Sequence, residues 1–164
     1  MKPKILLVNP PIYDFAAYDF WLKPYGLLRI GGRLRKSCKL YLFDFLDRHH
    51  PAFDPAQKIR TDEWGRGSYP GRRIEKPPCF AGIRRFYRRF GIDPGIFQNY
   101  LSEHGPFDAV LIQTVLTYWY PGVREVIEAV RRSSPQAKIV LGGFYATACT
   151  AVSYTHLTLP TKRI

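Results

Sequence analysis

Four short runs of apolar residues divide this chain and limit the folds open to it. They lie at residues 5–8, 40–45, 109–114 and 138–141. Each run has the length and composition of a strand that is buried on both faces of a sheet. Helical patterns separate the first run from the second and the third from the fourth. Strands that alternate with helices form parallel sheets through right-handed crossovers, so the pattern predicts an α/β fold.

The clearest helical pattern covers residues 121–132. Its apolar residues recur at the spacing of one helix face, with a proline near the first turn: Pro121, Val123, Val126, Ile127 and Val130. Residues 24–36 give a second helix, in which Gly31 and Gly32 permit close packing. We therefore predict a flavodoxin-like (Rossmann-like) parallel sheet with helices on both faces.

Residues 46–105 interrupt this alternation, and we expect a long insertion after the second strand. The segment is rich in proline, glycine, arginine and aromatic residues, and it is long for a loop without structure of its own. We predict short helices at 80–90 and 96–104. Such an insertion is typical of a lid or of a contact between domains.

Composition and length indicate one globular domain. The chain has 164 residues, of which 46% are hydrophobic and 23% charged. No apolar stretch reaches the roughly 20 residues of a membrane span, and no signal-peptide pattern is present, so we expect no membrane partner and a cytoplasmic location. Cys38, Cys79 and Cys149 are too scattered for a disulfide framework or a Cys-x-x-Cys metal site, so we expect buried or idle thiols.

The formal net charge is +12, and much of it lies in residues 58–89. Arginine pairs at 72–73, 84–85 and 88–89 could neutralise phosphates. Neither an RNA-recognition signature nor a zinc-finger spacing accompanies them. A solvated surface or a face that docks against another domain is the favoured interpretation, and nucleic-acid binding stays open as the alternative.

The last residues change character abruptly. Residues 152–161 resemble the translation of a transposon-end adaptor used in sequencing libraries, and consecutive adaptor codons can encode all of them. We therefore expect residues 151–164 to be non-native and the domain to occupy residues 1–150. The native protein would then continue beyond this point.

The turn after the first strand argues against two common ligands of such sheets. Asn9, Pro10, Pro11, Ile12 and Tyr13 include no glycine, and the two prolines remove N–H donors that a pyrophosphate would need. A dinucleotide is therefore disfavoured, although Asp44 ends the second strand where a ribose could bind. No Walker loop is present. A phosphoacceptor site would need acidic residues near the end of the first strand and a lysine further on, and Asp14 and Asp19 are adjacent in sequence only, so this site is disfavoured too.

Two motifs follow the third and fourth strands. Thr114-Val115-Leu116 and Gly142-Gly143 resemble the Ser-x-Leu and Gly-Gly signature of cobalamin-binding domains, with Thr114 in place of serine. "KILLVNPP" at 4–11, "PYGLL" at 24–28, "YWYPG" at 118–122 and "GGFYAT" at 142–147 resemble the amino-terminal part of cobalamin-dependent radical S-adenosylmethionine enzymes. The resemblance spans residues 4–45 and 107–150.

The resemblance implies that a corrinoid inserts its nucleotide tail at the carboxyl edge of the sheet. The residues then expected to contact it are Asn9, Pro10, Tyr13, Thr114, Leu116, Thr117, Gly142 and Gly143. The hydroxyl of Thr114 would bond or line the tail, the glycines would let backbone lie against it, and residues 118–120 would add apolar area. Residues 9–21 contain no histidine, so the cobalt is expected to have no protein histidine ligand.

The resemblance also implies a parent enzyme with an iron–sulfur cluster and S-adenosylmethionine in a carboxyl-terminal radical domain. The Cys-x-x-x-Cys-x-x-Cys spacing of that domain is missing here, so we expect this chain to bind its cofactor without catalysing a reaction. The expected partners are the corrinoid and the missing radical domain. The alternative is a basic α/β domain that binds nucleic acid or another protein.

Overall fold

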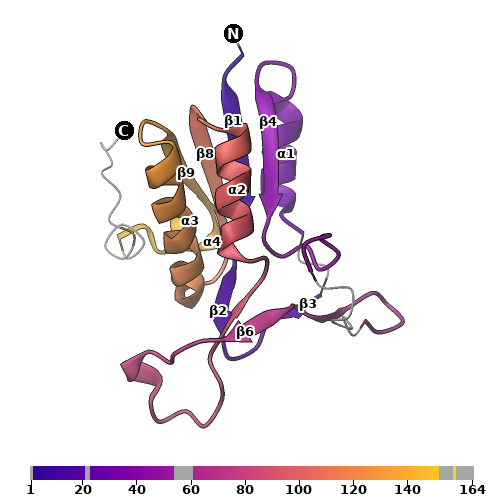
Figure 1. The fold of residues 1–164 in the computed structure, drawn as a ribbon, viewed down its shortest axis with the longest axis vertical. Coiled ribbons are helices and arrows are strands. Elements are labelled where there is room, and N and C mark those ends of the chain that lie inside the picture. The colour runs from indigo at the N-terminus through magenta and orange to yellow at the C-terminus, as the bar shows by residue number, and fades with distance from the viewer. Residues whose placement is uncertain (1, 21–22, 54–60, 152–156, 158–164) are drawn as a thin grey trace.

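A computed structural model describes residues 2–20, 23–53, 61–151 and 157 of the chain, and its centre is a parallel sheet (Figure 1). The strands are β1 (Lys4–Asn9), β4 (Lys39–Asp44), β8 (Ala109–Thr114) and β9 (Lys138–Gly143). They lie in the order β4-β1-β8-β9, and every neighbouring pair is parallel. The predicted flavodoxin-like α/β fold is confirmed.

Helices cover both faces of this sheet, because the apolar strands present side chains alternately to each face. Helix α1 (Tyr25–Leu34) packs on one face, where Leu27 meets Ile5 and Leu7. Helices α2 (Pro94–His104) and α3 (Tyr120–Ser133) cover the other face, in front of the sheet in Figure 1. The larger core lies under α2 and α3 and contains Leu6 and Val8 of β1.

The predicted non-native tail falls mostly outside the described residues. Within residues 151–164, the structure describes Ala151 and Leu157 alone. The side chain of Leu157 is buried in the larger core. A short helix, α4 (Phe144–Ala148), lies between β9 and this tail.

Two small antiparallel sheets lie below the parallel one (Figure 1). They are formed by residues between β1 and α1 together with residues between β4 and α2. The three-stranded sheet has the order β2-β7-β6, from β2 (Ile12–Asp14), β7 (Arg88–Phe90) and β6 (Gly71–Arg73). The two-stranded sheet pairs β3 (Tyr18–Asp19) with β5 (Gly67–Ser68). Part of the expected insertion, helix α2, is the crossover between β4 and β8.

The helix predicted at 80–90 is wrong, whereas the helix at 96–104 is confirmed within α2. A short 3-10 helix, η1 (Pro78–Phe80), ends where that helix was expected to begin, and β7 occupies its last residues. Strand β7 pairs on both sides, so Phe90 lies opposite Ile12 in β2 and opposite Gly71 in β6. These long-range pairings override the local preference of the segment.

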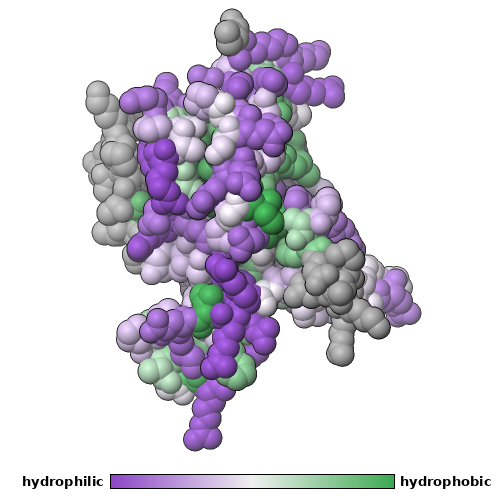
Figure 2. Space-filling view, in the orientation of Figure 1, coloured by the Kyte–Doolittle hydropathy of each residue, from purple (hydrophilic) through white to green (hydrophobic). Residues whose placement is uncertain are grey.

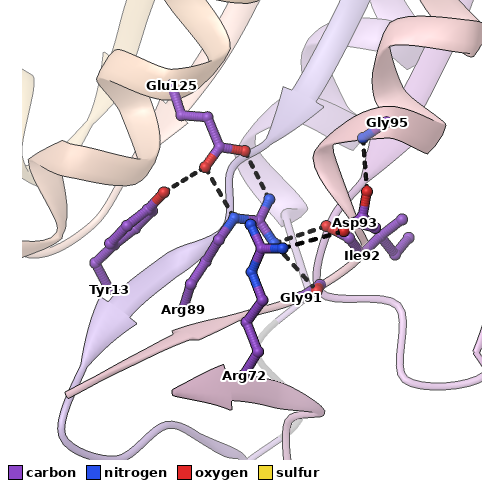
Figure 3. A network of polar contacts seen from close by, with 8 residues as sticks. All are labelled: Tyr13, Arg72, Arg89, Gly91, Ile92, Asp93, Gly95 and Glu125. Carbon is purple, nitrogen blue, oxygen red and sulfur yellow. Dashed lines mark hydrogen bonds and ion pairs between the residues drawn. The ribbon is translucent and has the colours of Figure 1, made fainter. Parts of the chain in front are cut away.

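A buried ion pair attaches the three-stranded sheet to α3 (Figure 3). The side chain of Arg89 is 2% exposed and binds Glu125 through Nη2 and Nε, at 2.6 and 2.8 Å. The hydroxyl of Tyr13 donates to the same carboxylate at 2.5 Å. The Nη1 group of Arg89 donates to the carbonyl of Ile92 at 2.8 Å. Burial raises the pKa of Tyr13, and the bond to Glu125 adds to the shift.

Replacing Glu125 with alanine should therefore destabilise the protein far more than the same change at Glu128, one turn further along α3. Glu125→Ala leaves a buried guanidinium without its counter-ion, which costs about 3–5 kcal/mol. Glu128 forms an exposed pair with Arg124 at 3.0 Å, and Glu128→Ala should cost about 0.5 kcal/mol or less. Urea unfolding of both variants measures the difference. Similar losses in the two variants would contradict the structural role of the buried pair.

Candidate functional site

The carboxyl ends of β1 and β8 mark the point where the order of the sheet reverses. From β1 the chain goes to β4 on one side, and β8 and β9 lie on the other side. Ligands of open parallel sheets bind outside the strand ends at such a point. A cavity of about 70 Å³ lies there, and its lining includes Asn9, Pro10, Lys23, Gln113, Leu116 and Trp119.

Four residues on the α1 face form a row across the carboxyl edge of the sheet, which we call the rim row. They are Asp44, Asn9, Gln113 and Gly142, one from each strand. Nδ2 of Asn9 donates to Oδ1 of Asp44 at 2.7 Å, and Nε2 of Gln113 lies 3.5 Å from Oδ1 of Asn9. The row ends at Gly142, where an added Cβ would meet no atom within 4 Å. It therefore runs from a carboxylate through two amides to an open surface.

Burial shapes the chemistry of the rim row. The side chain of Asn9 is 2% exposed, and its amide holds the carboxylate of Asp44 in place. Burial raises the pKa of Asp44, while hydrogen bonds from Asn9 and from the N–H of Leu46 oppose the shift. The positive charge of Lys23 also opposes it. Asp44 is thus a partly desolvated carboxyl group beside a lysine.

Trp119 lines one side of the cavity and belongs to the aromatic segment that follows β8. This segment forms a 3-10 helix, η2 (Thr117–Trp119), which leads directly into α3. The indole N–H of Trp119 donates to Oδ2 of Asp14 at 2.9 Å. Tyr118 is 52% exposed, and Tyr120 packs against the larger core. The three aromatic residues therefore lie in three environments: Tyr118 in solvent, Trp119 at the cavity and Tyr120 against the core.

A close backbone contact sets the position of the loop after β1. Gly122, in the first turn of α3, lies so near Pro11 that an added Cβ would come within 1.8 Å of the Pro11 carbonyl oxygen. Only glycine permits this approach. The contact holds this loop against α3, and Pro10 and Pro11 both line the cavity.

The structure brings some of the predicted cofactor-binding residues together and separates others. Asn9, Pro10 and Leu116 line the cavity. Tyr13 instead lines a separate hollow of about 420 Å³ beside α3, where it binds Glu125. Thr117 is exposed in η2.

The Thr114 and Gly-Gly motifs lie on adjacent strands but divide between the two faces of the sheet. Thr114 is 2% exposed on the side of the larger core, and its hydroxyl donates to the Gly142 carbonyl and accepts from the N–H of Ala146, each at 3.0 Å. Gly143 has a φ of 110°, and an added Cβ would lie 2.1 Å from the Thr114 carbonyl oxygen. Thr114 and Gly143 therefore build the turn into α4, while Gly142 is open on the α1 face.

Two residues of the site were missed from the sequence, Lys23 and Gln113. Gln113 follows four apolar residues in the run at 109–114, and strand alternation puts it on the same face as Leu111. That signal was available. Lys23 comes near Asp44 only through tertiary structure, and no local pattern marks it.

No protein family profile, curated protein or solved structure matches this chain.

None of the helices in the described residues is long and apolar enough to cross a membrane. Within the same part of the chain, no three side chains of His, Cys, Asp or Glu gather as a metal site would require. The three cysteines are not fully buried, and Cys79 is exposed.

Replacing Asp44 with asparagine should change how the free energy of unfolding depends on pH. A carboxyl group whose pKa is raised by folding binds its proton more tightly in the folded state, so its contribution to stability is greatest at low pH and falls as pH rises through the raised pKa. Asp44→Asn removes this loss and keeps an acceptor for Asn9. We expect the free energy of unfolding of the variant, relative to wild type, to increase from acidic to neutral pH. Chemical unfolding at several pH values measures it, and a difference that falls with pH would contradict the assignment.

Proposed function

We propose that this chain is a corrinoid-binding domain and that the cofactor lies over the carboxyl edge of the parallel sheet. The observation that supports it best is the rim row at the point where the sheet order reverses. The amide of Gln113 lies there next to buried Asn9 and near Lys23, with the open position Gly142 at the end of the row. Corrin rings carry amide side chains, which pair well with such groups.

In this proposal the cofactor binds in a different way from the one that the motifs suggest. The cavity of about 70 Å³ holds a few water molecules, whose share of liquid volume is about 30 Å³ each, and is too small for a nucleotide. The α1 face of β9 offers an alternative, because Val140 is 50% exposed and Gly142 carries no side chain. In this proposal a planar tail lies along Val140 and Gly142, and Gln113 bonds the amides of the ring.

Thr114 has a supporting role in this proposal. Its hydroxyl is already bonded on both sides, so it holds the turn into α4 and leaves the cofactor to the opposite face. When bound, the corrinoid would supply the reactivity of its cobalt. The residues of this chain would bind and orient the cofactor and exclude water from one side of it.

The wider setting is part of the same proposal. A carboxyl-terminal radical domain with an iron–sulfur cluster and S-adenosylmethionine would complete the enzyme, in the cytoplasm. That domain would approach the edge of the sheet at which Tyr118 is exposed. A partner there would cover the aromatic ring and the cofactor together.

Corrinoid binding and its dependence on Gly142 test the proposal. Gly142→Leu places a side chain in open space without a backbone clash, so the fold should be retained while the tail is blocked. We expect the wild-type protein to keep hydroxocobalamin through gel filtration and the variant to bind at least about tenfold more weakly by calorimetry.

Gly32→Leu is the matched control. Gly32 is exposed in α1, and an added Cβ there also meets no atom within 4 Å. This variant should bind hydroxocobalamin as the wild type does. A wild-type protein that retains no corrinoid, or equal binding by all three proteins, would contradict the proposal.

A further inference from the structure

The hairpin formed by β6, β7 and the loop between them carries a concentrated positive charge, and we call residues 71–90 the arginine hairpin. Five of its arginines are exposed: Arg72, Arg73, Arg84, Arg85 and Arg88. Arg73 lies directly opposite Arg88 in the strand pairing. Figure 2 shows the lower lobe of the molecule, to which this hairpin belongs, covered largely by hydrophilic residues. Like charges on facing positions are unfavourable in the free protein.

Little of this charge is neutralised within the described part of the chain. Arg72 pairs with Asp93 at 3.4 Å, with both side chains more than half exposed. No carboxylate of the described residues lies in ion-pair distance of Arg73, Arg84, Arg85 or Arg88. Arg89 points the other way and is neutralised by Glu125. Four guanidinium groups are therefore available to an anionic ligand.

The hairpin is hollow as well as basic. A depression of about 580 Å³ opens between its two sides. Its charged lining residues are Arg73, Glu75, Lys76, Arg84 and Arg85, so four cationic side chains face one carboxylate there, and Phe86 lies beside them. That volume is within the range of about 300–1,000 Å³ that is typical of small-ligand sites. The N–H of Ile74 donates to the carbonyl of Tyr87 at 3.1 Å, which holds the two sides of the loop together.

An exposed aromatic ring lies in the same depression. Phe86 is 54% exposed, and the guanidinium carbon of Arg73 lies 3.8 Å from the centre of its ring. Single-stranded nucleic acids are bound by this combination, because bases stack on aromatic rings and arginines contact phosphates.

We propose that the arginine hairpin binds single-stranded nucleic acid. Arg84, Arg85 and Arg88 contact successive phosphates, and a base stacks on Phe86 against the Arg73 guanidinium. Arginine suits this role because its planar group bonds phosphate oxygens in pairs and stacks on rings. The hairpin binds independently of the rim row and of the proposed corrinoid.

Fluorescence anisotropy with a labelled oligouridylate of about ten nucleotides tests this site on the 164-residue chain. The double variant Arg84→Gln/Arg85→Gln should bind at least about tenfold more weakly in about 0.1 M salt. The slope of log affinity against log salt concentration should be less steep by about 1.4 in this variant. Each phosphate contact on a single strand contributes about 0.7 to that slope, and the variant loses two. The control Arg29→Gln/Arg33→Gln removes the same charge from exposed positions of α1 and should change affinity by less than about twofold.

Phe86→Ala separates nucleic-acid binding from general attraction between charges. The variant keeps every charge and should lose about fivefold or more in affinity for the oligouridylate, because stacking contributes about 1–3 kcal/mol per base. Its affinity for heparin, which has no bases, should be unchanged. Equal losses in the two arginine double variants, an unaffected Phe86→Ala, or polyglutamate binding as tight as that of the oligonucleotide would each overturn the proposal.

Discussion

The parallel pairing of β1 with β8 is the constraint on which the rest of this structure depends. It joins segments that lie about two thirds of the chain apart and makes β1 a central strand with neighbours on both sides. Because the two strands are parallel and in register, their polar ends, Asn9 and Gln113, meet at one edge. The chain then leaves this edge in opposite directions, which opens the cavity that Trp119 and Leu116 close.

The buried pair of Arg89 and Glu125 extends this order to the inserted residues. The small antiparallel sheet is formed by segments on either side of α1 and β4, and its own core is small. Attachment to α3 through Glu125 gives it a fixed position below the parallel sheet. Tyr13, in β2, shares the same carboxylate and so ties the loop after β1 to this network. The edge of the sheet and the arginine hairpin are therefore parts of one body with separate chemistry.

The sequence predicts the strands of the parallel sheet better than the roles of individual residues at the site. The apolar runs at 5–8, 40–45, 109–114 and 138–141 all became strands of the expected sheet, because burial on two faces leaves a strong local pattern. The strand β7 was missed because its stability comes from partners far away in the chain. At the site, the motif predicts that Thr114 contacts the cofactor. Strand alternation turns the Thr114 hydroxyl toward the core and Gln113 toward the other face, and this depends on tertiary packing that the motif does not describe.

The central claim is that the rim row is the surface to which the corrinoid binds. Nuclear magnetic resonance of isotope-labelled protein during titration with hydroxocobalamin tests it most directly. If the corrinoid binds there, the signals of the Gln113 side-chain amide, the Trp119 indole N–H and the Gly142 backbone amide will shift together in a saturable way, while those of the arginine hairpin stay in place. Saturable shifts confined to other parts of the chain, or none at any concentration of the cofactor, would contradict it.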